Sequence, residues 1–403
     1  MSNAAPKLRE DELRVDLIEG RDAFLGLEKE WNAALARGPR DEPMLRHEWT
    51  RAWIENFAPG APLRVFVARS GKEIHAAVAL VETVERSVDT CFVPMTTWAT
   101  PTNDQSQRGG VLLGRRASEG LVAIWQKLLD TPGWDRLRLR ELPERAAEWQ
   151  LRELAEKAEH PTGLWISLRS PYLVLPPKAA AAPAPEKGKQ KKVTKLPTSD
   201  ARYEAVEASV DAKFRQNLRR RKRRLAEQGE VKYTLLDKAD DVALADFFDL
   251  EASGWKGKGG TAIALKPELV GFYTQLARDA AKRGALALGF IEVNGKRIAG
   301  HLSIVQAGRH YLLKVGYDES FSEFSPGQQL VSEAIRDACA RGLDEFDFLG
   351  PCMDWKLDWE PGLRTHSWLT IFRPTRKGLL VHEARHVLWP VARAVLARFR
   401  KEK

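Results

Sequence analysis

The sequence predicts an α/β (α+β) protein built from two tandem copies of one domain, each a mixed, mostly antiparallel sheet flanked by helices, with a C-terminal amphipathic helix. Three observations support this fold class. Asn294-Gly295 and Ala307-Gly308 are hairpin signals between apolar segments. Apolar residues recur at helical spacing from Leu330 to Cys339. The order hairpin, helix, strand occurs in both halves of the chain, which indicates a degenerate internal repeat.

The sequence signals for strands are clearest in the C-terminal copy of the domain. Segments 285–293 and 296–305 form the first predicted hairpin, and a third strand is expected at 310–317. A helix follows, Gly342 ends it, and a further strand is expected at 345–349. Three antiparallel strands therefore precede the helix.

The start of that helix is a candidate anion site. Ser325 is expected to be its N-cap, Pro326 suits the first helical position, and Gly327 leaves the backbone accessible. Unpaired N–H groups at such a helix end bind phosphate. We therefore expect a phosphate-bearing ligand at these residues and Gln328.

The N-terminal half shows the same order with weaker signals. Segments 63–69 and 74–82 read as a hairpin, 120–130 as a helix and 134–140 as a strand. Segment 133–139 also parallels 342–348 in its apolar and acidic pattern, which supports the repeat.

The expected domain organisation follows from a change in composition. Residues 177–200 are rich in Pro, Ala and Lys, have no apolar period, and are expected to form a flexible linker. They separate an N-terminal domain, 1–176, from a C-terminal domain, 201–375, which a basic amphipathic tail, 376–403, follows.

The length and composition of the chain indicate which broad class of protein to expect. The chain has 403 residues, of which 43% are hydrophobic, enough for two cores, and it contains no run of eighteen apolar residues that would span a membrane. Residues 1–10 do not resemble a secretory signal, so the expected location is the cytoplasm. Three scattered cysteines exclude a disulfide framework, and Cys339 is expected in a core.

The net charge of +9 is concentrated in two segments. Residues 187–224 carry fourteen basic and four acidic residues, and residues 373–403 carry nine basic and two acidic residues. Because the remainder is net acidic, the two basic segments are the candidates for contact with an anionic partner.

The first basic segment contains a helical stripe of Phe214, Leu218 and Leu225 with arginines on the other faces. A solvated helix face is the simplest interpretation. Nucleic acid is a weaker candidate for the partner, because no base-reading fold accompanies the arginines. Of the nucleic acids, tRNA remains an alternative.

The second basic segment, 376–403, predicts an amphipathic helix with Trp389, interrupted or kinked at Pro390. Such a helix suits the surface of an anionic membrane, and we expect a peripheral protein of the inner membrane. Packing of the same face on the protein core is an equal alternative. His382 and His386 match the zinc motif H-E-x-x-H, but the short chain beyond them favours coincidence, so no metal is expected.

The C-terminal half resembles the acyl-CoA-binding half of the GNAT N-acyltransferases, and more narrowly their CelD/BcsL-type branch. The motifs that carry the resemblance lie within 206–372 and are 251–262, Gly300-His-Leu302, 316–319, 325–327, 346–350 and Trp355-Lys356. The resemblance implies tandem GNAT-like domains and acyl-CoA as co-substrate. Only Gly327 remains of the glycines usual in the family's pyrophosphate loop. Bacterial ceramide synthases belong to this branch, and the related FemABX transferases use aminoacyl-tRNA.

Acylation of an amine requires a base, donors to the oxyanion and an acid for the thiolate. By position within the resemblance, His301 or Glu251 is the candidate base, Tyr317 the candidate acid, and Asp318 the residue that orients the amine. Lys314 joins Ser325–Gln328 among the expected donor-binding residues.

Two further residues, Trp255 and Lys256, lie in a Gly-rich segment and are candidate substrate contacts, although an ordinary surface loop explains them equally well. Trp49 and Trp53 are one helical turn apart and are expected to pack rather than to act in chemistry.

Three functions remain open from the sequence. The first is an acyl-CoA-dependent N-acyltransferase acting on an amphipathic amine at the cytoplasmic membrane face, with a sphingoid base or another envelope precursor as acceptor. The second is an aminoacyl-tRNA-dependent transferase of the FemABX kind. The third is a non-catalytic module in polysaccharide or lipid assembly.

Overall fold

The structure is a computed structural model that describes residues 12–177, 199–254, 257 and 259–389. The chain forms two compact units, residues 1–168 with 365–403, and residues 169–364. The two crossings between units fall inside strands β7 (Thr162–Val174) and β13 (Gly362–Phe372). The unit boundaries therefore differ from the expected domain limits at 176 and 201.

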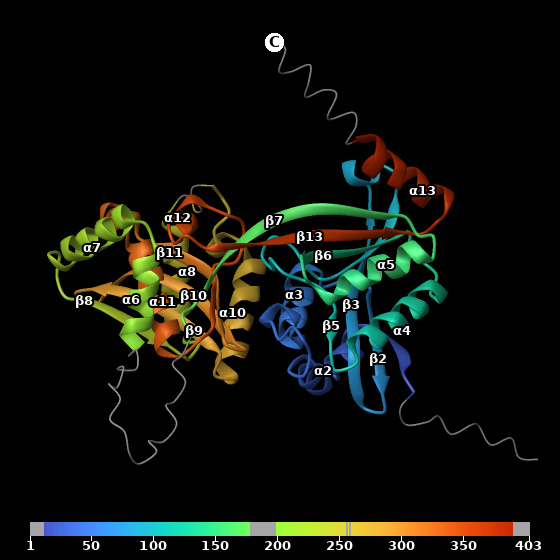
Figure 1. The fold of residues 1–403 in the computed structure, drawn as a ribbon, viewed down its shortest axis with the longest axis horizontal. Helices are drawn as coiled ribbons and strands as arrows, with labels where there is room; N and C mark the ends of the chain where they lie inside the picture. The colour runs from blue at the N-terminus through green and yellow to red at the C-terminus, as the bar shows by residue number, and fades with distance from the viewer. Residues whose placement is uncertain (1–11, 178–198, 255–256, 258, 390–403) are drawn as a thin grey trace, which may run out of the picture. The chain divides into compact units, whose positions relative to one another are not determined.

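Unit 1 contains helices on both faces of a mostly antiparallel sheet (Figure 1). Its strands follow the order β1-β2-β3-β4-β6-β13-β7, with β5 on β3, and β4 and β6 pair in parallel. Its remaining elements are β1 (Arg14–Glu19), α1 (Arg21–Leu25), α2 (Glu28–Leu35), η1 (Pro43–Leu45), α3 (His47–Phe57), β2 (Leu63–Ser70), β3 (Glu73–Glu85), η2 (Val88–Thr90), β4 (Met95–Ala99), β5 (Leu112–Leu113), α4 (Ala117–Asp130), β6 (Arg136–Pro143), η3 (Ala147–Trp149), α5 (Gln150–Lys157), α13 (Arg376–His382) and the π-helix η6 (Glu383–Leu388).

Alternation along β2 and β3 sends apolar side chains to both faces of this sheet. Phe66 and Val78 join the core under α4 and α5, whereas Val65 and Val67 join the core under α1, α2 and α3. Both strands are accordingly buried along most of their length, as expected for a sheet covered on two sides.

Unit 2 repeats this plan. Its sheet has the order β7-β12-β11-β10-β9-β8, and β11 with β12 is its parallel pair. Its other elements are α6 (Ser199–Ser209), α7 (Ala212–Ala226), β8 (Val231–Leu236), α8 (Asp241–Ala252), η4 (Ile263–Leu265), α10 (Pro267–Lys282), β9 (Leu286–Val293), β10 (Lys296–Gln306), β11 (Arg309–Tyr317), η5 (Glu319–Phe324), α11 (Pro326–Ala340), β12 (Glu345–Asp347) and α12 (Asp354–Leu357).

In each unit a hairpin is followed by a helix that joins two parallel strands, β4 to β6 through α4 and β11 to β12 through α11, and this confirms the predicted repeat. The predicted fold class is also confirmed, since each sheet is mixed and mostly antiparallel and is flanked by helices. The hairpin turns form where the sequence indicates them. Asn294 and Gly295 have φ of 50° and 79°, and Ala307 and Gly308 have φ of 47° and 74°.

The two faces of the unit 2 sheet carry different helices (Figure 1). Helix α8 approaches β11 so closely that a Cβ at Gly316 would lie 2.4 Å from the Cα of Glu251. Helices α6 and α11 pack on the opposite face, where Val331, Ile335 and Ala338 of α11 are buried. Glycine at position 316 therefore sets the distance between α8 and the sheet.

Among the described residues, no helix combines the length and apolar character required to cross a bilayer. Residues 178–198, most of the expected linker, and residues 390–403, half of the expected amphipathic tail, lie outside the described part of the chain.

Candidate active site

The parallel strands β11 and β12 separate early. Their pairing covers only Arg309 with Glu345, His310 with Phe346, and Tyr311 with Asp347. Strand β11 continues to Tyr317 with β10 as its partner. Within the described part of unit 2, β12 therefore does not pair with β11 beyond Tyr311, and the two strands diverge there.

Helix α11 begins beside the end of β11. A Cβ at Gly327 would lie 3.3 Å from Cδ1 of Tyr317, so the tyrosine ring covers the first turn of the helix. Tyr317 itself is 37% exposed. The structure therefore brings together the predicted acid, Tyr317, and the predicted donor-binding residue Gly327.

Ser325 is the N-cap residue of α11, as predicted, but its side chain does not cap the helix. Ser325 has left-handed φ and ψ of 50° and 55° and makes no capping side-chain hydrogen bond. The preceding turn, η5, ends in this conformation, and the Ser325 carbonyl instead accepts from the backbone N–H groups of Gln328 and Gln329. Pro326 occupies the first turn of the helix as expected.

The hydroxyl of Ser325 is used differently. It accepts a hydrogen bond of 2.6 Å from the guanidinium of Arg221 on α7. The basic helix α7 therefore places a cation at the N-terminus of α11, where the helix dipole also favours negative charge. The sequence pattern indicated the basic helix and the helix start at Ser325, but it did not indicate that the two are in contact.

Gln328 has a structural role. Its side-chain amide donates to the carbonyl of Trp355 at 2.8 Å, and its side-chain oxygen accepts from Nε1 of Trp359 at 2.8 Å. Lys356, which is buried, donates to the carbonyl of Pro351 at 3.1 Å. Gln328 thus holds the α12 segment against the first turn of α11.

His301 lies fully buried on the α11 face of β10. Its Nε2 is 3.0 Å from the hydroxyl of Tyr233 and its Nδ1 is 2.8 Å from Oγ of Ser303. Burial lowers the pKa of His301 to about 3, and burial also lowers the pKa of the neighbouring His310. An enclosed imidazole that stays neutral and has both nitrogens bonded is poorly placed to take a proton from a substrate.

Two other candidates lie on the opposite face of the sheet. Glu251 is buried in α8, and its carboxylate accepts a hydrogen bond of 2.8 Å from the backbone of Ile263. Lys314 has its ammonium group 5.3 Å from the centre of the Tyr273 ring in α10. The structure therefore separates Glu251 and Lys314 from Tyr317 and Gly327.

Asp318 organises the turn after β11. Its carboxylate accepts from Lys296 at 2.8 Å and from the backbone of Ser320 at 3.0 Å. The hydrogen bond from Lys296 is the main reason that the pKa of Asp318 is lowered. Trp255 and Lys256 lie outside the described residues.

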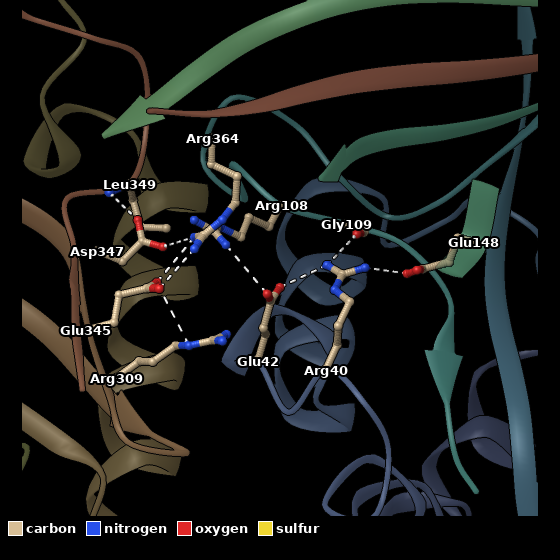
Figure 2. Close-up of polar contacts among 10 residues, drawn as sticks. All are labelled: Arg40, Glu42, Arg108, Gly109, Glu148, Arg309, Glu345, Asp347, Leu349 and Arg364. Carbon is tan, nitrogen blue, oxygen red and sulfur yellow. Dashed lines mark hydrogen bonds and ion pairs between the residues drawn. The ribbon is translucent and has the colours of Figure 1, made fainter. Parts of the chain in front are cut away.

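A charged cluster under β12 was not predicted from the sequence (Figure 2). Arg364 donates to Glu345 at 2.9 Å and to Asp347 at 3.2 Å, and Asp347 is completely buried. Asp347 also accepts from the backbone N–H of Leu349 at 2.9 Å. This cluster fixes the end of β12, the point from which the two parallel strands diverge.

Unit 1 contains a separate buried network, also drawn in Figure 2. Arg40 bonds to Glu42 at 2.9 Å and to Glu148, and Arg108 lies 3.5 Å from Glu42. A pocket lies beside Gly109, whose carbonyl accepts from Arg40 at 3.4 Å. It is lined by Trp31, Met44, Leu45, Thr50, Ala77, Ala79, Thr100, Pro101, Thr102, Gly109, Gly110 and Leu112. Trp49 is buried, as expected for a packing residue.

The stripe predicted on the basic helix α7 is confirmed. Leu218 and Leu225 are buried, and Phe214 packs edge to face on Trp359 with the two ring centres 5.3 Å apart. Several basic residues on its other faces form ion pairs, namely Arg219 with Glu207, Lys222 with Glu333 and Arg224 with Glu323. Much of the charge of α7 is therefore balanced locally.

The motif residues His382 and His386 stack with their ring centres 5.6 Å apart. Nε2 of His382 lies 3.0 Å from the carbonyl of Thr162. Within the described residues, no group of three or more His, Cys, Asp and Glu side chains is arranged to hold a metal ion.

Comparisons with known proteins agree with this geometry. Residues 212–357 match the family described as Acetyltransferase (GNAT) domain, whereas no curated protein matches the chain in sequence. The solved structure of FemX is 11% identical, with 85% of this chain and 95% of FemX covered and a TM-score of 0.54. The C-terminal domain of an Agrobacterium fabrum protein described as a lysylphosphatidylglycerol synthetase is 10% identical, with 90% and 96% covered and a TM-score of 0.50.

At these identities the two structures establish similarity of fold only. The narrower CelD/BcsL-type resemblance stays a prediction. The family match and the diverging strands β11 and β12 agree on a GNAT-type fold for residues 212–357, within a chain whose fold is similar to that of FemX.

Proposed function

We propose that the protein is an acyl-CoA-dependent N-acyltransferase whose donor binds with its phosphates at the start of α11. The observation that carries the proposal is the hydrogen bond from Arg221 to Ser325, which fixes a guanidinium beside that helix end. Arginine and an open helix N-terminus both bind phosphate oxygens. The proposed donor site therefore consists of Arg221, Ser325 and the backbone of Gly327.

The divergence of β11 and β12 suits the remainder of such a donor. An extended thioester arm would lie along β11 beyond Tyr311, where β12 no longer pairs with it. Backbone N–H groups there would stabilise the oxyanion when an amine attacks the thioester carbonyl. Tyr317, at the end of the same strand, would then donate its proton to the departing thiolate.

The amine must lose a proton to a base that we leave unassigned. His301 and Glu251 fit this role poorly, because His301 is enclosed and Glu251 binds the backbone of Ile263 on the other face of the sheet. For the acceptor we propose an amphipathic amine at the cytoplasmic membrane face, with a sphingoid base as the first candidate. The name of one structural neighbour, a lysylphosphatidylglycerol synthetase, is consistent with a lipid acceptor.

Calorimetric titration with CoA tests the donor site. Arg221→Ala should weaken CoA binding by roughly ten- to a hundredfold, because a charge-assisted hydrogen bond contributes roughly 1.5–3 kcal/mol. Gly327→Glu should abolish binding, since the new side chain meets the ring of Tyr317 and adds negative charge. Arg220→Ala is the matched control, because Arg220 is an exposed neighbour on α7 and its removal costs the same formal charge. Equal affinity in all four proteins would place the donor elsewhere.

An aminoacyl-tRNA-dependent transfer is the second candidate. The similarity of fold to FemX and the exposed arginines of α7 favour it. Filter binding with bulk tRNA at low and moderate salt separates the two proposals. Saturable tRNA binding that loses affinity in Arg220→Ala and Arg223→Ala, together with no CoA binding, would replace the acyl-CoA proposal with the tRNA proposal.

A further inference from the structure

Exposed apolar side chains are concentrated in one part of unit 1. Of the twenty large hydrophobic residues that are exposed in the described chain, eleven belong to three short segments. We call nine of them the α13 surface: Val84, Val88, Phe92, Trp165, Leu379, Leu380, Val387, Leu388 and Trp389. The other two, Leu164 and Ile166, alternate with Trp165 on β7 and point to the other face of that strand. Apolar exposure on this scale within one region is characteristic of an interaction site.

Polar contacts hold the three segments side by side. Arg385 of η6 donates to Asp89 of η2 at 3.0 Å, and its guanidinium lies 5.6 Å from the centre of the Trp165 ring in β7. His382 contacts the carbonyl of Thr162 at 3.0 Å. Figure 1 shows α13 at the same end of unit 1 as the first residues of β7. The three segments that carry the α13 surface therefore lie beside one another in unit 1.

Helix α13 is anchored through its other side. Val381 is fully buried with Phe372 and Met95, and the hydroxyl of Thr375 caps the helix by accepting from the backbone of Gly378. Leu379 and Leu380 are 47% and 58% exposed and contribute nothing to that core. Packing on unit 1 thus explains Val381 but leaves the outward residues without a structural function.

Basic residues in and after these segments favour an anionic partner for the α13 surface. Arg86 and Arg376 are exposed in the segments that form the α13 surface. The sequence continues beyond Trp389 for fourteen residues, with five basic residues, one acidic residue and the apolar Val391, Val395 and Phe399. Trp at the border of an apolar surface and basic residues around it are the features by which proteins bind the interface of an anionic bilayer.

We propose that the α13 surface docks unit 1 on an anionic lipid membrane. Phe92, Trp165, Leu380 and Leu388 enter the interface between headgroups and acyl chains, and Arg86 and Arg376 bind lipid phosphates. This inference extends the proposed function by naming the surface that brings the protein to a lipid acceptor, and it does not depend on the identity of the acyl donor.

Co-sedimentation with vesicles tests the proposal. The full-length protein should sediment with vesicles of phosphatidylcholine and phosphatidylglycerol at low salt, and at least tenfold less with pure phosphatidylcholine. Leu380→Glu combined with Leu388→Glu should lower the affinity for anionic vesicles at least tenfold, and Phe92→Glu should lower it severalfold. Higher salt should weaken binding in part, because it screens charge and leaves apolar burial unchanged.

The matched control is Val242→Glu on α8. Val242 is 68% exposed and lies outside the α13 surface, so the same chemical change there should leave vesicle binding unaltered. Far-UV circular dichroism and the urea midpoint establish that each variant is folded. CoA titration of the same proteins should give unchanged affinity, which separates a failure of the membrane proposal from a failure of the donor site.

Three results would overturn the proposal. The first is full-length protein that ignores anionic vesicles at low salt. The second is a folded double variant that binds them as tightly as the unaltered protein. The third is a concentration-dependent dimer, measured by light scattering, that the double variant abolishes while vesicle binding persists, because the occupant of the α13 surface would then be a second copy of the chain.

Discussion

Arg364 binds the buried carboxylate of Asp347 at 3.2 Å while it also binds Glu345 at 2.9 Å. The pair lies at the end of β12, and Asp347 in turn accepts from the backbone of Leu349. The divergence of β11 and β12, on which the candidate active site depends, is therefore held by an ion pair with one completely buried partner.

We expect Arg364→Ala to destabilise the protein by about 3–5 kcal/mol, because it leaves the carboxylate of Asp347 buried without its cation. Arg364→Lys should recover part of the loss, since one ammonium group cannot bridge both carboxylates as a guanidinium does. Urea unfolding measures both. Arg341→Ala is the control: its partner, Asp337, lies one helical turn away at 3.6 Å, and such a pair contributes less than about 1 kcal/mol. Equal losses in the two alanine variants would contradict the assignment.

Gly289→Ala should destabilise unit 2 by about 1–3 kcal/mol through overpacking. The new Cβ would lie 2.2 Å from Nε2 of His301 and 2.8 Å from the hydroxyl of Tyr233. Gly254→Ala serves as the comparison, because the nearest atom to its Cβ, Oε1 of Glu319, is 3.6 Å away. Chemical denaturation that ranks the two variants in the opposite order would contradict the close packing of His301.

Tyr317→Phe should lower turnover by roughly 10²-fold or more with little change in the affinity for CoA, since general acid catalysis contributes about 10²–10⁴-fold and the lost proton acts only in the transition state. Steady-state kinetics and calorimetry on the same preparation separate the two effects. Unchanged turnover would remove Tyr317 from the proposed mechanism.

The buried histidines predict a loss of stability in acid. Unfolded His301 takes a proton near pH 6.5, whereas in the folded protein its pKa is about 3. The unfolded state therefore binds more protons between these values, so the stability from neutral His301 is complete above pH 6.5 and decreases as the pH falls toward 3.

His301→Gln should remove that contribution, which amounts to about 2 kcal/mol between pH 7 and pH 5 at about 1.4 kcal/mol per pH unit. Urea unfolding at the two pH values measures the difference. His310, whose pKa burial also lowers, contributes in the same direction and remains in the variant. An identical pH dependence in the variant and the unaltered protein would contradict a buried, neutral His301.

Local signals in the sequence were sufficient to predict several secondary-structure elements. Asn294-Gly295 turns the hairpin because both residues adopt positive φ at low cost, and Gly342, with φ of 74°, follows the end of α11. The apolar period from Leu330 to Cys339 predicts α11 because burial on one face of a helix depends only on spacing along the chain. These features involve neighbouring residues, and a single sequence contains the information for them.

Ser325 shows how far local reasoning reached. Serine before Pro-Gly predicts the N-cap position correctly, but η5 ends at Ser325 in a left-handed conformation, and Arg221, 104 positions earlier, donates to its hydroxyl. The division of strands β7 and β13 between the two units was also not predictable. Residues 172–174 of β7 pair with β12 of unit 2, and residues 366–372 of β13 pair with β6 of unit 1. These pairings depend on partners far away in the chain, which the local sequence does not reveal.

The sequence by itself determined the repeated α/β architecture, the strands around the hairpins and the helix that follows β11, since these depend on turn chemistry and apolar periodicity. Only the tertiary structure decided which candidate residues meet. It joins Tyr317 to Gly327 and Arg221 to Ser325, it encloses His301, and it places Glu251 and Lys314 on the opposite face of the sheet. The physical reason is that the pleat of β10 and β11 and the packing of α7, α8 and α11 fix where each side chain lies, and these contacts join residues far apart in the chain.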